Sequence, residues 1–135
     1  MARSLVSTIH AANTTLIVEG NMDAVGEFFT PDYVAHVTSK DLPGGHGGIR
    51  RYLRMLRHAF PSLQVEIEIF LKGKDRVAWQ RTLRGVQRGD YAGFPATGRR
   101  IVWRDMFASR FREGLIAEDW VVTDLAERLL LARKR

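Results

Sequence analysis

The spacing of apolar residues changes at Pro61, and this change constrains the fold more than any other feature of the chain. Before Pro61, segment 49–60 has apolar residues three or four positions apart, which is the spacing of a helix with one buried face. These residues are Ile49, Tyr52, Leu53, Leu56 and Phe60. After Pro61, apolar and polar residues alternate over 63–71, which is the pattern of a half-buried strand. The chain is therefore expected to form helices first and a sheet afterwards.

The other elements follow from the same two periods. Helical spacing predicts two earlier helices at 4–18 and 22–29, the second capped by Asn21, before a short extended piece at 33–38. Alternation predicts further strands at 77–85, 101–111 and 115–122, with a loop at 88–98 and a last helix at 124–135. We expect an α+β fold in which three N-terminal helices pack in the concave face of a curved, mostly antiparallel sheet, followed by a short C-terminal helix.

Composition excludes several classes of protein. The 135 residues suit one domain, 1–135, and the absence of cysteine excludes disulfides and thiolate zinc sites. No apolar run approaches the ~20 residues of a membrane span, and the first ten residues lack the apolar stretch of a signal peptide, so we expect a cytoplasmic protein. The net charge of +6 is spread along the chain, which argues against a nucleic-acid partner. The sequence also lacks the spacings of metal and nucleotide sites, so neither a metal nor a cofactor is expected.

Four segments together resemble the SnoaL-like polyketide cyclase family. They are PDYVAH at 31–36, the glycine-rich stretch and helix that lead to AFPSLQVEI, GFPATGRR at 93–100, and SRFREGLIAEDWVVTD at 109–124. Each segment alone is a weak signal, but the set occurs in the right order over nearly the whole chain. The resemblance implies the cone-shaped α+β barrel shared with ketosteroid isomerase and scytalone dehydratase, commonly as a dimer, with a pocket for a flat apolar substrate.

The family's catalytic pair does not carry over to this chain. When the last hairpin is aligned through Gly114, the family's catalytic Asp and His fall at Val121 and Phe107. Neither side chain can transfer a proton, so any acid–base chemistry must use other groups. The family also includes members associated with hydroxylation, which keeps a second reaction type open.

Asp105 and Arg81 are polar residues in otherwise apolar rows of two predicted strands. Asp105 lies between Trp103 and Phe107 on one strand face, where a carboxylate is costly unless it is paired. It is the candidate general base. Arg81 can pair with Asp105 across neighbouring strands or hold a substrate oxyanion. A structural ion pair is the alternative to both roles.

His36 is the third catalytic candidate, because it closes PDYVAH and an imidazole titrates near neutral pH. A carboxylate–arginine pair would also resemble the limonene-type epoxide hydrolases, which need a second carboxylate. Asp119 or Asp124 would have to supply it, and for Asp124 a helix cap is the favoured role.

Aromatic side chains provide candidate walls for substrate, although at least two of the tryptophans should serve only the core. The candidates are Tyr33, Trp79, Trp103, Phe107 and Trp120. His46, in the glycine-rich stretch 40–48, is a candidate residue of a flexible lid over bound substrate.

The sequence therefore predicts a cofactor-independent enzyme that performs acid/base chemistry, such as ring closure or isomerisation, on a hydrophobic carbonyl-bearing molecule. The alternatives are a non-catalytic protein that binds a small ligand, or a family member that assists hydroxylation or epoxide hydrolysis. A homodimer is expected through the outer sheet face, which carries Gln80, Thr82, Arg104, Met106 and Ala108. Burial is expected for Leu53, Leu56, Phe60, Val65, Ile67 and Ile69.

Overall fold

A six-stranded sheet in the order β2-β1-β6-β5-β4-β3 forms the centre of the fold. The computed structural model describes residues 3–38, 40–42 and 44–133. Its elements are α1 (Leu5–Ala12), a π-helix (Asn13–Val18), a 3₁₀-helix (Met22–Glu27), β1 (Phe29–Val37), β2 (Lys40–Leu42), α2 (Gly45–Ala59), β3 (Gln64–Lys72), β4 (Arg76–Val86), β5 (Arg100–Arg112), β6 (Leu115–Thr123) and α3 (Leu125–Arg133). Only the pairing of β1 with β6 is parallel within these ranges. The predicted α+β class is confirmed.

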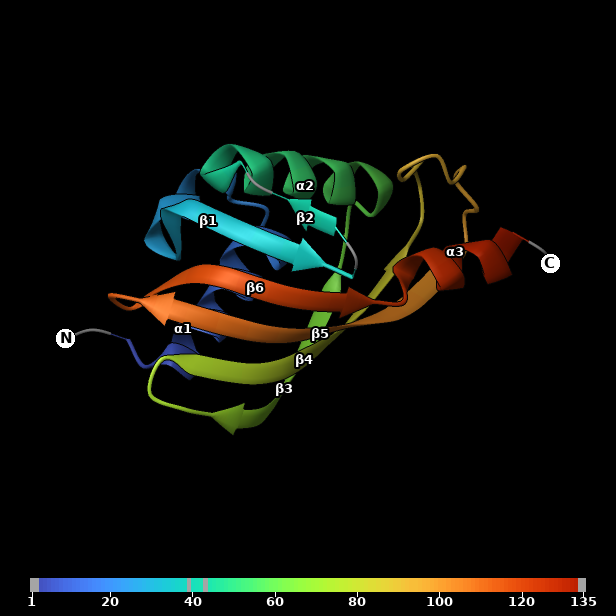
Figure 1. The fold of residues 1–135 in the computed structure, drawn as a ribbon. Helices are drawn as coiled ribbons and strands as arrows, with labels where there is room; N and C mark the ends of the chain where they lie inside the picture. Colours follow the sequence, from blue (N-terminus) through green and yellow to red (C-terminus); the bar gives the residue numbers. More distant parts are fainter. Residues whose placement is uncertain (1–2, 39, 43, 134–135) are drawn as a thin grey trace.

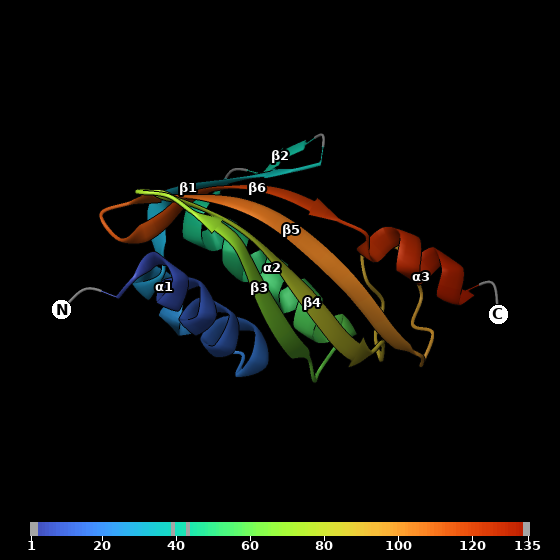
Figure 2. The same cartoon turned by 90° about the horizontal axis from the view of Figure 1, so that it is seen from below.

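The sheet curves around α1 and α2, which lie on its concave side, while α3 lies beyond one end of it (Figure 1; Figure 2). The main core forms where α2 meets the sheet and includes Leu56, Phe60, Leu83 and Trp103. Burial of these side chains holds helix and sheet together, at roughly 1.5–3 kcal/mol for each large apolar residue. Within the described residues, no helix is both long and apolar enough to cross a membrane.

The predicted core is correct for α2 and only partly correct for β3. Leu53, Leu56 and Phe60 are buried, whereas Val65, Ile67 and Ile69 are half-buried. The difference arises because β3 is an edge strand that has a sheet neighbour on one side only. The apolar residues of β3 therefore lie on the inner face of the sheet, as their alternation predicted, but they remain partly accessible to solvent.

The segments before β1 depart from regular α-helix. Helix 4–18 forms as predicted but changes from α to π at Asn13. The predicted second helix is a short 3₁₀-helix that ends at Glu27, and the Asn21 side chain does not cap it. The helical part of the chain before β1 therefore consists of α1, the π-helix and one short 3₁₀-helix.

The glycine-rich stretch 40–48 is more ordered than predicted. It forms β2 and the first turn of α2, which begins at Gly45 rather than at Ile49. The carbonyl of Gly44 accepts a hydrogen bond from the Gly48 amide, so four residues that looked like a loop start the helix. Pro43 of this stretch, and residues 134–135 of the predicted last helix, lie outside the described residues.

A bulge in β6 decides which of its side chains face the helices. Arg110 of β5 pairs with Glu118, but the next residue, Phe111, pairs with Ile116, so Ala117 is an extra residue in β6. An extra residue reverses the alternation of a strand. Ile116 and Asp119 are therefore both buried, although they are three residues apart.

Candidate functional site

Arg81 and Asp105 form a buried ion pair on the concave face of the sheet. They lie directly opposite each other on β4 and β5, and Arg81 Nε donates a hydrogen bond of 2.8 Å to Asp105 Oδ2. The two residues are 7% and 3% exposed. Burial makes such a pair sensitive to the loss of either partner, because the remaining charge has no water to solvate it.

The rest of the Arg81 guanidinium is fixed by the helices. Nη1 donates to Asn13 Oδ1 at 2.9 Å, and Nη2 donates to the Tyr52 hydroxyl at 3.2 Å. Burial opposes the charge of Arg81, but Tyr52 and Asp105 outweigh it and raise its pKa. Arg81 is thus a charged residue held by three partners.

One oxygen of Asp105 remains without a partner. Within the described residues, Oδ1 is buried and accepts no hydrogen bond, whereas Oδ2 accepts from Arg81. A buried, unpaired carboxylate oxygen is costly and needs an explanation. It is available to a ligand that carries a proton.

Asp119, on β6, is a second buried carboxyl group on the same face. Its Oδ2 accepts a hydrogen bond of 2.6 Å from the Tyr33 hydroxyl, and its Oδ1 accepts one from the Ser109 hydroxyl. Ser109 Oγ in turn accepts the indole N–H of Trp79 at 2.9 Å. Burial raises the pKa of Asp119, although the two hydroxyls and the charge of Arg81 act in the opposite direction.

Some of the candidate aromatic walls line this cluster. Trp79 stacks on Phe107 with ring centroids 4.1 Å apart, and the Arg81 guanidinium lies over the Phe107 ring. Tyr33 reaches the cluster through Asp119. Trp103, in contrast, packs against Phe60 in the core and belongs to the scaffold.

The loop between β4 and β5 adds two aromatic side chains to the core. Tyr91 and Phe94 of this loop form a bridge to each other and pack against the main core. Burial and then the charge of Asp105 raise the pKa of Tyr91.

His36 and Trp120 lie on the outer face of the sheet, and this placement contradicts their predicted roles in the interior site. They are partners in the register of β1 and β6, and their rings stack at 5.1 Å. Trp120 is 39% exposed. The bulge at Ala117 explains the placement of Trp120, because it turns Asp119 inward and Trp120 outward.

His46 is likewise not part of a flexible lid. It lies in the first turn of α2, where its Nε2 donates to the carbonyl of Phe29 at 2.8 Å. This bond ties α2 to β1, so His46 has a structural contact where a substrate contact was predicted. Asp124 lies at the predicted cap position directly before α3, where its backbone carbonyl accepts from the Arg128 amide, while its carboxylate accepts from the Arg104 amide and from Arg128 Nε.

His36 forms an ion-pair cluster of its own on the outer face. Nδ1 lies 2.6 Å from Asp41 and Nε2 lies 2.6 Å from Glu118, which also binds Arg110. Carboxylates only accept hydrogen bonds, so the ring is doubly protonated in this arrangement. Hydrogen bonds from Asp41 and then Glu118 raise the pKa of His36, and the bonds from His36 and Arg110 lower the pKa of Glu118.

These shifts predict that His36 stabilises the fold less as the pH rises. A raised pKa in the folded state gives stability that is fully present below the unfolded pKa of ~6.5 and lost as pH rises through the folded value. The lowered pKa of Glu118 acts at the acid end, where its contribution is lost as pH falls. Urea unfolding of wild type and His36→Gln should therefore differ most near pH 6 and converge by pH 9. His10→Gln, at an exposed site on α1, is the control, and an equal pH trend in both variants would contradict the prediction.

Two residues of the interior cluster escaped sequence reasoning. Asn13 lies where α1 changes to π-helix, and its Nδ2 also donates to the Ile9 carbonyl. Such π segments often occur at functional sites. Ser109 has the same strand parity as Asp105 and Phe107, which was the available signal for it. Within residues 3–38, 40–42 and 44–133, no group of three or more His, Asp or Glu side chains comes together as a metal site.

Two surface pockets do not include the charged residues of the cluster. One of about 500 Å³ is found where β4 and β5 meet the end of α2, and one of about 360 Å³ is found on the outer face beside His36 and Trp120. Neither is lined by Arg81, Asp105 or Asp119. The interior cluster is the better candidate for chemistry, because its carboxyl groups are desolvated and the pocket groups are exposed.

A curved sheet that encloses two helices and a desolvated polar cluster defines the class of cone-shaped α+β domains. Within that class, the family profile of SnoaL-like polyketide cyclases matches residues 8–130. The chain belongs to the SnoaL-like polyketide cyclase family. Comparison with curated proteins gives no match.

Solved structures show the same fold. A candidate polyketide cyclase from Acidithiobacillus ferrooxidans is 23% identical, covers 99% of each chain and has a TM-score of 0.83. IdmH, a candidate polyketide cyclase from Streptomyces antibioticus, is 25% identical over 98% of this chain and 100% of its own, with a TM-score of 0.79. AclR, a candidate hydroxylase from Streptomyces galilaeus, is 24% identical over 97% of this chain and 83% of its own, with a TM-score of 0.75. Similarity at this level establishes the architecture, and the chemistry has to be argued from the site.

Proposed function

We propose that this protein is a cofactor-independent enzyme that performs acid/base chemistry on a hydrophobic, carbonyl-bearing small molecule. The observation that carries the proposal is a pair of buried carboxyl groups in different surroundings. Asp105 faces a guanidinium and has one unpaired oxygen, whereas burial raises the pKa of Asp119. Two buried carboxyl groups in different surroundings can serve as acid and base partners.

In this proposal Asp105 takes a proton from the carbon beside the substrate carbonyl. Its free Oδ1 forms the new O–H bond, and the electron pair of the broken C–H bond moves into the carbonyl to give an enol or enolate. Asp119, whose two oxygens accept from Tyr33 and Ser109, gives up one of these hydrogen bonds in its protonated form and supplies its proton to the carbonyl oxygen. Arg81 is a positioning residue, because its Nε, Nη1 and Nη2 are all occupied by protein partners. The enol then attacks within the same molecule or is protonated at another carbon.

The stacked pair Trp79 and Phe107 supports an apolar, aromatic substrate, because it gives the cluster an aromatic wall. The substrate would displace the loop residues Tyr91 and Phe94, which now pack against the core beside Asp105. This requirement favours an apolar molecule that can replace two aromatic rings.

Exchange of α-hydrogens in D₂O tests the proposal before the natural substrate is known. Bicyclic aromatic ketones, such as 2-tetralone, should lose their α-proton NMR signals faster with the protein than with the same protein unfolded in urea. Binding of these ketones without faster exchange would overturn catalysis and favour a non-catalytic ligand-binding protein. Neither binding nor exchange across a panel of ketones would overturn the substrate class.

Epoxide hydrolysis is the second candidate, and the position of Asp119 favours it. An arginine–carboxylate pair with a second buried carboxyl group is the arrangement needed to protonate an oxirane and direct water at it, and Arg81 is near enough to Asp119 to affect its pKa. Conversion of cyclohexene oxide to its diol, with the oxygen taken from H₂¹⁸O, would support this reaction. No diol beyond the rate without protein would exclude it.

We also propose that the protein forms a homodimer through the outer sheet face. Met106, Trp120 and Val122 are 49%, 39% and 61% exposed there, and they adjoin one another in the register of β5 and β6. Exposed apolar patches of this kind commonly mark an interface. Met106→Asp should convert a dimer to a monomer in sedimentation at tens of micromolar, roughly the range for stable dimers. Leu131→Asp, at an exposed site on α3, is the control, and a wild-type protein that sediments as a monomer would contradict the proposal.

A further inference from the structure

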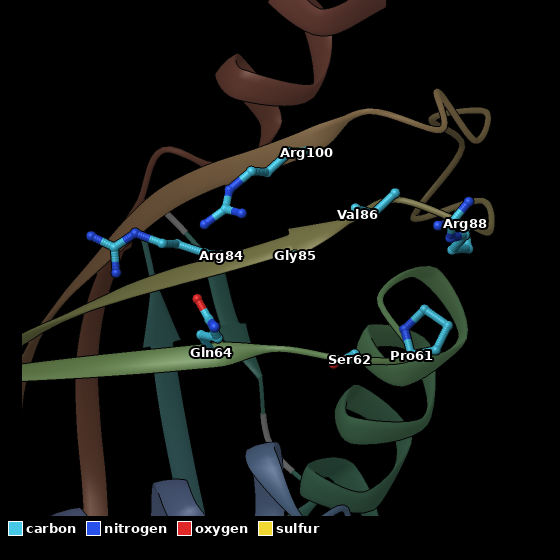
Figure 3. Close-up of a pocket in the computed structure, with 8 residues that line it drawn as sticks. All are labelled: Pro61, Ser62, Gln64, Arg84, Gly85, Val86, Arg88 and Arg100. Atoms are coloured by element: carbon cyan, nitrogen blue, oxygen red, sulfur yellow. The ribbon is translucent and has the colours of Figure 1, made fainter.

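The pocket of about 500 Å³ lies at the end of the sheet, outside the interior cluster. It is formed where α2 ends, β3 begins and the loop between β4 and β5 starts and finishes (Figure 3). Its lining residues are Pro61, Ser62, Gln64, Arg84, Gly85, Val86, Arg88 and Arg100.

Three of these lining residues are arginines, and no acidic residue lines the pocket. Arg84 pairs with Val102 and Arg100 with Val86 in the antiparallel register, so the two arginines are diagonal neighbours on one face of the sheet. In Figure 3 the Arg100 guanidinium reaches from β5 toward β4 on the side of Arg84. Like charges so placed repel each other. A bound anion would remove this repulsion.

The protein itself balances little of this charge. Glu66 Oε2 lies 3.5 Å from Arg84 Nη1, and the two side chains are 68% and 32% exposed. An exposed ion pair with that separation contributes about 0–1 kcal/mol. A phosphate or carboxylate with two oxygens can bind guanidinium groups in a bidentate manner and would displace Glu66.

The floor of the pocket is apolar and depends on a glycine. A Cβ atom at Gly85 would lie 2.7 Å from the Ser62 carbonyl and 2.8 Å from Leu63 Cδ2, so only glycine lets β4 approach the start of β3 here. Pro61 and Val86 complete this surface, while Gln64 and Ser62 add neutral hydrogen-bonding groups. The volume exceeds that of a lone phosphate ion and leaves room for an organic group.

We propose that this pocket binds the anionic end of an organic ligand, a phosphate or carboxylate attached to an apolar chain, at a site separate from the interior cluster. Arg84 and Arg100 hold the anion, and the chain lies on the floor around Gly85. Arg88 and Arg100 stand at the two ends of the loop that carries Tyr91 and Phe94. A ligand in the pocket therefore contacts both ends of this loop.

Amide NMR titration at low ionic strength tests the proposal with three probes: hexyl phosphate, hexanoate and hexyltrimethylammonium. Both anions should shift amide signals at residues 61–64, 84–88 and 100 in a saturable way, and the cation should not. Arg100→Gln should weaken hexyl phosphate binding about tenfold or more, the usual effect of losing a charge-assisted hydrogen bond. Arg51→Gln, at an exposed site on α2, removes the same charge and should change the affinity less than twofold.

A second pair of variants tests the role of Glu66 without loss of a ligand-binding group. Glu66→Gln should tighten hexyl phosphate binding, whereas Glu68→Gln, two residues further along the same face of β3, should change it less. Equal affinity for inorganic phosphate and hexyl phosphate would overturn the apolar-chain part of the proposal. Equal affinity of wild type and Arg100→Gln, or equal shifts with the cationic probe, would overturn the site. Ketone exchange reports on the interior cluster alone, so either proposal can fail without the other.

Discussion

The Asp105→Asn variant should keep the fold at a lower free energy of unfolding, because Arg81 loses its counter-charge, and should lose about 10²- to 10⁴-fold of its α-hydrogen exchange rate, the usual contribution of a positioned general base. Asparagine preserves the shape of the side chain and its bond to Arg81 Nε, because the amide oxygen still accepts. It cannot take a proton from carbon. The loss should appear in kcat, with KM for the ketone little changed.

Two further variants make this result specific. Asp23→Asn, at an exposed site in the 3₁₀-helix, removes the same charge and should exchange at the wild-type rate. Asp119→Asn should also slow exchange if Asp119 supplies the proton to the carbonyl oxygen. Exchange at the wild-type rate in Asp105→Asn would show that Asp105 is not the base, and an effect of Asp119→Asn alone would assign that role to Asp119.

Arg81→Met should lower the free energy of unfolding by about 3–5 kcal/mol, because breaking a buried ion pair leaves the other charge without a partner. Methionine fills part of the space of the arginine stem. Asp105 then keeps a buried carboxylate that no guanidinium faces, and Asn13 and Tyr52 each lose a hydrogen bond. Urea unfolding followed by circular dichroism measures the loss.

The double variant Arg81→Met/Asp105→Leu distinguishes an unpaired charge from a packing defect. Removing both charges should recover part of the stability, since an apolar pair of similar volume often replaces a buried ion pair without loss. Arg84→Met, on the outer face of the same strand, should change stability by less than about 1 kcal/mol. An Arg81→Met variant within that same limit would show that the pair contributes little to the fold.

The sequence predicted the fold well where an element keeps one period along its length. The change at Pro61 separates α2 from β3, and the alternation in β4 and β5 holds without a bulge from Arg76 to Val86. Polar residues that interrupted an apolar row, Arg81 and Asp105, could therefore be assigned to one face and to one pair. No bulge between β4 and β5 changed the sheet face on which Arg81 and Asp105 lie.

The predictions of site residues were wrong where a local irregularity, such as a β-bulge, changed the hydrophobic period of an element. The bulge at Ala117 reversed the faces of β6, so Trp120 was assigned to the interior and Asp119 was given only a secondary role. His36 could have been placed correctly, because Tyr33 lies three residues earlier on the same strand and must face the other side. His46 was missed because four residues with three glycines do not look like the first turn of a helix.

The extra residue at Ala117 also gives this fold a simple route to altered chemistry. If Ala117 were paired regularly instead of bulged, strict alternation in β6 would bring Trp120 under the helices and send Asp119 to the surface. The interior would exchange a carboxylic acid for an indole, while every strand and helix kept its place. A one-residue change of register in one hairpin would therefore change the chemistry of the interior more abruptly than a point substitution would.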